Sequence, residues 1–398
     1  MAELGQGPIR EKLDMPIPAD LRDMYDKMSA AGHKFYIVGG AVRDRLLNKV
    51  PKDYDLATDA KPDNVIELLG GDPTIRLDLT GKSFGVVRAK TSEGNEYEIA
   101  TFRTDIGKGR RPSGVQFATI EDDVSRRDLT INALFYDIAT GEVVDYVGGL
   151  RDLSKGVVRT VGNPADRFDE DKLRVLRAVR FAGRVGSDLD EETAQAIKDD
   201  PHLDQVSRER IRDEFLKGIA QAVQVPHFLG ITDELGLFDE IFPSAQINRD
   251  FARTKDPAVQ LALLLRDNPV DSVVSLLRSM KYWKVEGVEL IKPSTFLIAL
   301  QDLDPSIAVD MKKKFNNAKL SPAQVTEFAE ESGMPMGDVQ AFLKFVEMPL
   351  AGDPQEFMAQ GLKGPDIGRA MDGAERQQYL DVLGESLVRI YIHMLLRS

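Results

Sequence analysis

Residues 35–55, which read FYIVGGAVRDRLLNKVPKDYD, restrict how this chain can fold more than any other stretch. The short apolar run at 35–38 is typical of a strand, and the Gly39-Gly40 pair after it predicts a tight turn into a helix. Backbone N–H groups at such a turn, together with the N-terminus of the helix, can bind an anion. The stretch therefore predicts a strand, a turn and a helix, with an anion site at the turn.

Two aspartates end this stretch, with one residue between them. Side chains in an extended segment alternate between two faces, so Asp53 and Asp55 should point to the same side. Carboxylate oxygens suit Mg²⁺, and a bound Mg²⁺ can bridge them to the phosphates of a nucleoside triphosphate. We therefore expect Asp53 and Asp55 to hold Mg²⁺ beside the anion site.

The ordered combination of glycine turn, Arg43 in the next helix and paired aspartates resembles the head-domain signature of the class II tRNA nucleotidyltransferase and bacterial poly(A) polymerase family. The resemblance implies an α+β fold, in which a nucleotidyltransferase head with a mixed sheet, similar to the polymerase-beta palm, precedes an all-helical neck, body and tail. It also implies template-independent addition of CCA to the 3′ end of tRNA from CTP and ATP, with release of pyrophosphate. Asp53 and Asp55 would hold two Mg²⁺ ions in that reaction.

The composition is typical of a soluble globular protein. The chain has 398 residues, of which 42% are hydrophobic and 29% are charged, and this length suits about two to four domains. It contains no cysteine, which excludes disulfides, zinc–thiolate sites and thiol nucleophiles. No apolar run is long enough to span a membrane, and the first residues lack the apolar core of a signal peptide. We expect a cytoplasmic protein; its oligomeric state does not follow from the sequence.

The net charge of −13 counts against a broad, non-specific nucleic-acid binder. Such proteins depend on contacts to phosphates and are usually basic. A local basic face can still bind RNA on an acidic protein. If tRNA is the partner, we therefore expect a basic concave face that acidic outer surfaces offset.

Short strand patterns and helices alternate over the first part of the chain, and the pattern from about residue 165 onward is almost wholly helical. Residues 1–34 are expected to form a lead-in helix, because Leu21, Met24, Tyr25 and Met28 recur at helical spacing. The expected strands are 35–38, 55–57, 85–89, 96–102, 116–118, 143–147 and 157–161.

Read with the resemblance, this pattern divides the chain into four parts, with Gly148-Gly149 as a hinge. The expected parts are a catalytic head over 1–147, a base-recognising neck over 148–217, a helical body over 218–280 and a helical, tRNA-binding tail over 281–398.

Glu96 and Glu98 share one face of a predicted strand. A third carboxylate from a neighbouring strand would complete a metal site resembling that of the wider polymerase palm. Glu98 matches the family position better than Glu96, so we expect Glu98 to join Asp53 and Asp55 as a catalytic carboxylate.

Residues 106–117, IGKGRRPSGVQF, are rich in glycine and basic side chains and predict a mobile basic loop. In the family, a flexible loop at this place helps the enzyme switch from C to A addition. The loop has full length here, which favours addition of the whole CCA over addition of CC alone.

Residues 126–137 read RRDLTINALFYD and are expected to place Arg127 and Asp128 just before an amphipathic helix. The family uses this motif to hold the ribose and the triphosphate of the nucleotide. The resemblance therefore implies that Arg127 and Asp128 bind nucleotide, with Gly39, Gly40 and Arg43 as further triphosphate contacts.

Residues 166–184 contain arginines at three- and four-residue spacing, which form one stripe on a helix. The family motif Glu-Asp-x-x-Arg matches here and implies that Asp171 and Arg174 read the base, with Arg177 over the triphosphate or near the base. A carboxylate accepts from the amino group of C or A, and a guanidinium donates to the ring nitrogen beside it. U and G present the opposite pattern, so the pair would accept CTP and ATP and reject UTP and GTP.

Other readings stay open. Within the same class the chain could be a poly(A) polymerase, or an enzyme that adds only CC or only A. A dinucleotide-binding oxidoreductase would explain the Gly-Gly turn, but the sequence has no GxGxxG motif. A catalytically silent RNA-binding relative would leave the intact Asp53 and Asp55 without a use.

Overall fold

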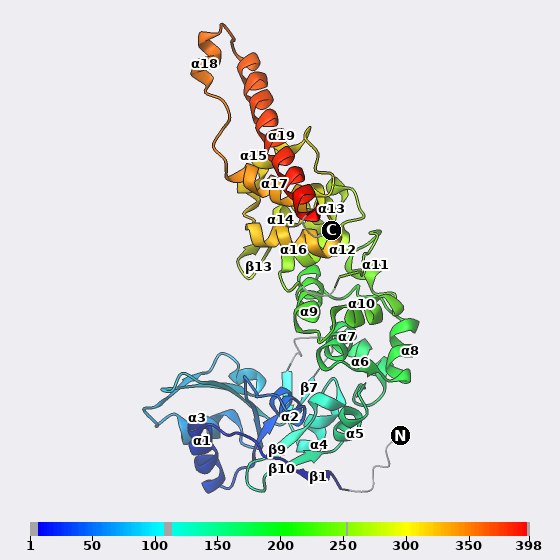
Figure 1. Cartoon of the computed structure of the whole chain (residues 1–398). Coiled ribbons are helices and arrows are strands. Elements are labelled where there is room, and N and C mark those ends of the chain that lie inside the picture. The colour runs from blue at the N-terminus through cyan, green and yellow to red at the C-terminus, as the bar shows by residue number, and fades with distance from the viewer. Residues whose placement is uncertain (1–6, 107–113, 252–253, 396–398) are drawn as a thin grey trace. The chain divides into compact units, whose positions relative to one another are not determined.

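The computed structural model describes residues 7–106, 114–251 and 254–395. The chain divides into two compact units, Met1–Val206 and Ser207–Ser398 (Figure 1). The first unit contains a mixed sheet and the second is built mainly of helices, which confirms an α+β fold with a mixed-sheet head and a mostly helical remainder. Among the described helices, none combines the length and apolar character needed to cross a membrane.

The first unit is organised around an eight-stranded sheet in the order β1-β10-β9-β2-β3-β6-β5-β4. Most neighbours are antiparallel, but β3 and β6 run parallel. The strands are β1 (Ile9–Lys12), β2 (Phe35–Val38), β3 (Asp55–Thr58), β4 (Ile75–Asp78), β5 (Val86–Thr91), β6 (Glu96–Thr101), β9 (Phe135–Asp137) and β10 (Glu142–Asp145).

Both faces of the central strands are buried. All four residues of β2 are buried, and they alternate between two apolar clusters. Phe35 and Ile37 pack with apolar residues of α1 (Ala19–Ala30) and α3 (Pro62–Leu69). Tyr36 lies on the opposite face, 6.1 Å from Phe102 and 5.9 Å from Phe135 between ring centres. This two-sided burial explains why β2 reads as a continuous apolar run.

Short elements complete the first unit. The strands β7 (Arg103–Ile106) and β8 (Gly114–Phe117) pair with each other, and β11 (Val157–Val158) pairs in parallel with β12 (Asp188–Leu189). The remaining elements are α2 (Gly40–Leu46), η1 (Lys82–Phe84), α4 (Ile120–Ser125), η2 (Thr130–Asn132), α5 (Gly149–Ser154), α6 (Pro164–Glu170), α7 (Leu173–Val185) and α8 (Glu191–Asp199).

The second unit packs its helices around an aromatic and aliphatic core. Phe215 contacts Phe228, Phe238 and Phe242, and Phe345 contacts Tyr379. Its elements are α9 (Arg208–Gln221), α10 (Val225–Glu234), α11 (Phe238–Ile241), α12 (Pro257–Leu265), α13 (Val270–Ser279), β13 (Lys284–Val285), β14 (Val288–Glu289), α14 (Ile291–Leu300), α15 (Ala308–Ala318), α16 (Pro322–Ser332), α17 (Met336–Glu347), α18 (Pro354–Ala359) and α19 (Pro365–Leu395).

The expected strands all occur, with ends that differ by a few residues. Two expectations were wrong. The lead-in segment is not helical throughout, because β1 precedes α1 and pairs with β10. No amphipathic helix follows Arg127 and Asp128: the chain makes the single turn η2 and then enters β9, whose Phe135 and Tyr136 bury on opposite faces of the sheet. Burial on both faces of a strand outweighed the helical pattern there.

Candidate active site

The glycine turn joins β2 to α2 in a conformation that requires glycine. Gly39 has φ 68° and ψ −122°, and its N–H donates to the Leu134 carbonyl at 3.0 Å. A Cβ on Gly39 would lie 3.5 Å from the Asn132 carbonyl oxygen and 3.8 Å from Arg127 Nη1. The turn therefore lies directly against the segment that follows Arg127, and the two motifs meet in space.

Arg43 lies behind this turn, not at its surface. Its side chain is 1% exposed and stacks 4.9 Å from the centre of the Phe181 ring. Nε and Nη2 donate to Asp44 Oδ1 at 2.9 and 2.6 Å, and Nη1 donates to Asn132 Oδ1. Burial lowers the pKa of Arg43, and the Asp44 carboxylate opposes this shift. The Arg43 guanidinium thus has Asp44, Asn132 and Phe181 as its partners inside the protein. Its expected contact with the triphosphate stays a prediction.

Asn132 connects the two motifs, and the sequence argument did not single it out. Its side-chain oxygen accepts from Arg43, and its backbone oxygen accepts from Arg127 Nη1 at 3.3 Å. The signal was present in the quoted motif, where Asn132 lies five residues after Arg127, but no local pattern shows that it reaches α2. Asn132 thus fixes both arginines with one residue.

Arg127 is held by a buried carboxylate and an aromatic ring. Nη2 and Nε donate to Asp123 Oδ2 at 3.0 and 3.3 Å, and the guanidinium lies 4.7 Å from the centre of the Phe135 ring. Burial would raise the pKa of Asp123, but Arg127 and Arg126 outweigh it and lower that pKa below its usual value. The charged carboxylate therefore orients Arg127 next to the glycine turn.

Asp128 pairs with Arg177 across the first unit. Arg177 Nε and Nη2 donate to Asp128 Oδ2 at 2.7 and 2.6 Å. Burial works to raise the pKa of Asp128, but the ion pair with Arg177 lowers it overall. The two expected nucleotide-binding residues thus come together, although they lie on separate motifs.

We expected Asp171 and Arg174 to lie on one continuous helix, but the structure divides this segment into α6 and α7. The helix α6 ends at Glu170, and Asp171 has the extended backbone angles φ −152° and ψ 106°. Its Oδ1 accepts from the Leu173 N–H at 3.1 Å, at the start of α7. Arg174 Nη1 donates to Glu170 Oε2 at 2.5 Å, so Glu170, the first residue of the Glu-Asp-x-x-Arg motif, holds the guanidinium. Asp171 therefore lies at a break between two helices.

The paired aspartates lie on one side of the chain, as alternation requires. Asp53 and Asp55 are exposed, whereas Tyr54 between them is buried and donates its hydroxyl to the Pro16 carbonyl at 2.6 Å. This anchor turns both carboxylates outward at the start of β3. The sequence-based expectation about their direction is therefore confirmed.

Glu98 is the register partner of Asp55 on the neighbouring strand β6. Desolvation by nearby protein atoms is the largest cause of the raised pKa of Asp55, although part of this residue is accessible to solvent. Glu98 and then Asp53 raise this pKa further, and Arg127 lowers it. Glu98 also pairs with Arg88 at 3.3 Å. Within the described ranges, no three Asp, Glu, His or Cys side chains form a metal-holding cluster, so the third carboxylate stays a prediction.

A hollow opens beside Glu98 on the same part of the sheet. It is lined by residues of β4, η1, β5, β6 and β7, among them Phe84, Arg88, Glu98 and Arg103. At the two ends of the expected basic loop, Ile106 of β7 pairs with Gly114 of β8. Residues 107–113 of that loop lie outside the described residues.

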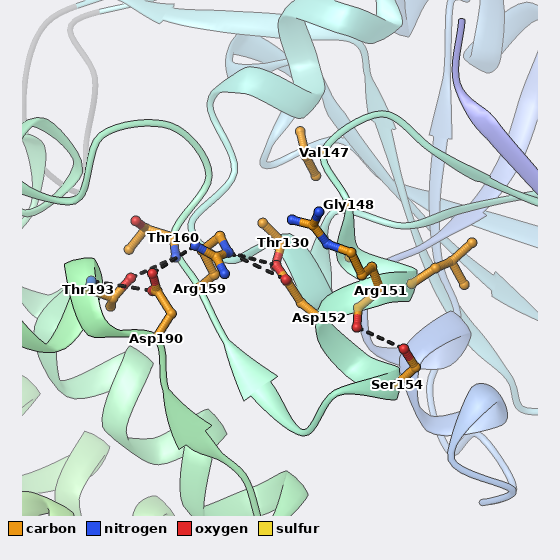
Figure 2. Close-up of polar contacts among 12 residues, drawn as sticks. Thr130, Val147, Gly148, Arg151, Asp152, Ser154, Arg159, Thr160, Asp190 and Thr193 are labelled. Carbon is orange, nitrogen blue, oxygen red and sulfur yellow. Dashed lines mark hydrogen bonds and ion pairs between the residues drawn. The ribbon is translucent and has the colours of Figure 1, made fainter. Parts of the chain in front are cut away.

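A second ionic connection supports the Asp128 segment (Figure 2). Arg159 donates from Nη1 to Asp190 Oδ2 at 2.8 Å and from Nε to Asp152 Oδ2 at 3.2 Å. Thr130 donates its hydroxyl to Asp152 at 2.8 Å and its N–H to the Arg159 carbonyl at 2.9 Å. The sequence argument missed these residues because their partners are distant along the chain.

Two family models match this chain. The Poly A polymerase head domain matches residues 35–159, and the probable RNA and SrmB-binding site of polymerase A matches residues 186–247. The CCA-adding enzyme of Bacillus subtilis is 38% identical over 321 residues, which cover 75% of this chain and 76% of that enzyme. The chain belongs to the family of CCA-adding enzymes and bacterial poly(A) polymerases. It is therefore a nucleotidyltransferase, as the motifs predicted.

Other members of the family agree with this placement. Poly(A) polymerase I of Salmonella typhimurium is 37% identical over 245 residues, but these cover only 59% of this chain and 51% of that enzyme. The crystal structure of the Bacillus stearothermophilus CCA-adding enzyme in complex with CTP is similar at a TM-score of 0.69 and 25% identity, over 95% of this chain and 99% of that one. The CCA-adding enzyme of Bacillus subtilis thus matches a larger share of this chain than poly(A) polymerase I of Salmonella typhimurium does.

Proposed function

We propose that this nucleotidyltransferase adds CCA to the 3′ end of tRNA with CTP and ATP as substrates. One observation carries the proposal: the register of β3 and β6 brings Asp55 opposite Glu98, and the turn between β2 and α2 brings Gly39 against Arg127. Carboxylates for a divalent cation and donors for a triphosphate thus occupy one region of the same unit. The CCA-adding relatives match most of this chain and support tRNA as the acceptor.

A divalent cation fits the carboxylates that are present. Asp53 and Asp55 are exposed on one side of the chain, and the pKa of Asp55 is raised first by desolvation and then by the nearby carboxylates of Glu98 and Asp53. We propose that Asp53 and Asp55 hold Mg²⁺, with Glu98 as the neighbouring carboxylate. A bound Mg²⁺ would lower the pKa of the RNA 3′-hydroxyl and offset the charge that develops on pyrophosphate.

The residues around the glycine turn position the nucleotide. The Gly40 N–H and Arg127 hold the triphosphate, whereas Gly39, whose own N–H donates to the Leu134 carbonyl, shapes the turn. Asn132 keeps Arg127 and Arg43 in place. Asp128, fixed by Arg177, accepts from the ribose hydroxyl. The buried ion pairs hold these groups in position before the substrate arrives, which reduces the cost of ordering them in the reaction.

Base selection is assigned to Asp171 and Arg174. The break between α6 and α7 places the carboxylate and the guanidinium, both partly buried, at a joint between helices, where small movements can fit either C or A. Glu170 holds Arg174 and so directs its remaining donors. The same pair leaves buried polar groups mismatched with U or G, which gives strong discrimination.

The helical parts are assigned to the acceptor. We propose the base-recognising neck at 148–217, the body at 218–280 and the tRNA-binding tail at 281–398, with the catalytic head at 1–147. The cytoplasmic location expected from the sequence stays part of this proposal.

An incorporation assay tests the function directly. Purified protein and Mg²⁺ are given tRNA transcripts that end before the CCA, after C and after CC, with CTP, ATP, both, or UTP and GTP. Addition of C, C and A followed by a stop is the expected result, resolved at single-nucleotide length. Addition of CC alone, or of A alone, identifies a partial CCA enzyme, and no incorporation overturns the proposal.

Poly(A) polymerase is the second candidate, because poly(A) polymerase I is among the similar proteins. It predicts long A tracts on RNAs that are not tRNA. An unstructured RNA ending in CC is the discriminating substrate: the proposed CCA activity adds little to it, whereas a poly(A) polymerase extends it without a stop.

A further inference from the structure

A large aromatic side chain is exposed on the second unit. Trp283 is the single tryptophan of the chain, and 51% of its surface is accessible. The Lys281 ammonium lies 4.9 Å from the centre of its ring. A lone exposed apolar side chain is common and needs no explanation. Proteins that bind single-stranded nucleic acid, however, stack bases on exposed aromatic rings beside positively charged side chains.

The chain fixes this ring from its N-terminal side. Tyr282 is fully buried, lies 5.5 Å from the Phe242 ring and donates its N–H to the Leu277 carbonyl at 2.8 Å. Arg212 Nη1 donates to the Lys281 carbonyl. The residues before Trp283 are therefore anchored in the core, and the ring projects from a rigid base.

A tight hairpin fixes the ring from the other side. The strands β13 and β14, of which β13 is labelled in Figure 1, pair directly after Trp283. The two residues between them, Glu286 and Gly287, have φ 49° and 89°, as a type I′ turn requires. The Leu290 N–H donates to the Trp283 carbonyl at 3.2 Å and closes the base of the hairpin.

The surroundings of the ring are positive on an acidic protein. Residues 278–292 contain four basic side chains and two acidic ones, whereas the whole chain has a net charge of −13. Lys284 follows the ring directly and is exposed, and Glu289 is engaged by Lys292 at 3.6 Å. A local excess of positive charge attracts a polyanion such as RNA, with which the surface can form several phosphate contacts.

We propose that Trp283, with Lys281 and Lys284, forms a contact surface for the RNA substrate, called here the Trp283 surface. The ring stacks on a base or ribose, and the two lysines meet phosphates. The inference rests on the proposed function, which makes tRNA the RNA in question. Stacking accepts any base, so this surface contributes affinity for the acceptor and takes no part in choosing CTP or ATP.

Tryptophan fluorescence of the full chain gives a direct test, because the signal comes from position 283 alone. A tRNA transcript lacking CCA is titrated without nucleotides, and binding is measured in parallel by filter retention. We expect saturable quenching with the same Kd by both methods. No fluorescence change at RNA saturation overturns the inference.

Variants separate stacking from general stability. Trp283→Ala should raise the Kd and the KM for tRNA about tenfold with kcat unchanged, whereas Trp283→Phe should retain most of the affinity. Val288→Ala, at an exposed apolar position of the same hairpin, is the matched control and should behave as wild type. Lys281→Gln and Lys284→Gln should each reduce the slope of log Kd against log salt by about 1.

The remaining outcomes are distinct from failure of the proposed function. Equal tRNA affinity in wild type and Trp283→Ala overturns the surface while CCA addition stands. Fluorescence that changes with protein concentration in the absence of RNA, together with a smaller sedimenting species for Trp283→Ala, assigns the surface to self-association and also overturns it. If wild type binds tRNA with quenching but adds no nucleotide, the surface stands and the proposed catalysis fails.

Discussion

Asp55 on β3 lies opposite Glu98 on β6, and these two strands run parallel within an otherwise largely antiparallel sheet. The pairing places the two carboxylates side by side near the start of β3, where Asp53 also points outward. Desolvation by burial is the largest cause of the raised pKa of Asp55, and the charges of Glu98 and then Asp53 raise it further. A cation bound there, as we propose, would offset this cost.

The raised pKa of Asp55 makes a prediction about stability. A carboxyl group whose pKa is raised in the folded state stabilises the fold at pH values below its ordinary pKa of 3.8. This contribution disappears as the pH rises through the raised pKa. At neutral pH without metal, Asp55→Asn should therefore increase the free energy of unfolding, by less than about 1 kcal/mol because solvent screens this exposed site. Urea unfolding at pH 4 to 8 measures the effect.

Mg²⁺ provides the control for Asp55→Asn. Saturating Mg²⁺ should stabilise wild type by linkage and leave the variant nearly unchanged. A wild type whose unfolding midpoint does not respond to Mg²⁺ would contradict the assignment of Asp55 as a ligand.

Asp53→Ala should abolish nucleotide incorporation, with a loss of at least about 10³-fold, because a metal site supplies several kcal/mol of transition-state stabilisation. Stability should change little, since Asp53 is exposed and Tyr54 holds the strand start. Single-turnover extension of a tRNA ending in CC measures the rate. The matched control is Asp63→Ala, which removes an exposed carboxylate of the same unit that pairs with Lys82 at 2.7 Å. A near-normal rate for Asp53→Ala would contradict the metal assignment.

The Asp128–Arg177 pair should contribute to stability and binding together. Asp128→Asn should cost about 1–3 kcal/mol of unfolding free energy, after allowing for solvent at the partly exposed Arg177, and should raise the KM for both CTP and ATP. Because the folded-state pKa of Asp128 is lowered, its contribution is present above its ordinary value of 3.8 and is lost as the pH falls through the lower value.

Thermal unfolding from pH 3 to 7 checks this sign. Glu96→Gln removes the exposed pair with Lys90 at 2.6 Å and should cost less than about 0.5 kcal/mol, so it controls for loss of any ion pair. An effect of Asp128→Asn that is equally small would show that the pair is not energetically important.

Arg174→Ala should relax base choice and not merely slow the reaction. Without the guanidinium, the site no longer rejects the ring N–H of U or G, and discrimination against UTP should fall by about tenfold or more. Competition between CTP and UTP on a tRNA lacking CCA measures it. Arg167→Ala is the control, because Arg167 also contacts Glu170, at 2.7 Å, but lies outside the motif; unchanged selectivity in Arg174→Ala would refute the protein template.

Local patterns predicted the part of the site that is made within one stretch of chain. The apolar run, the glycine turn and the alternation of Asp53 and Asp55 each depend on neighbouring residues, and the structure contains β2, α2 and β3 where these patterns placed them. The helical stripe of Arg174, Arg177, Arg180 and Arg184 likewise forms on α7. Spacing along one element carries enough information for such features.

Contacts between distant segments could not be read in the same way. Nothing near Arg43 indicates that it is buried against Asn132, and nothing near Asp128 indicates Arg177 as its partner. The amphipathic pattern after Asp128 predicted a helix, but burial on both faces of the sheet favours β9. These outcomes depend on the tertiary arrangement, which one sequence without homologues does not reveal.

The pairing of β1 with β10 has a consequence for biosynthesis. The partner of β1 is β10, with Ile9 opposite Asp145, and β10 is translated only after the other strands of the eight-stranded sheet. We therefore expect the nascent head to keep an open sheet edge on the ribosome until β10 has emerged, because this pairing joins strands that are distant in sequence. A ribosome that stalls before β10 would hold a head in which Asp53, Asp55 and Glu98 are already synthesised but one strand edge is unprotected.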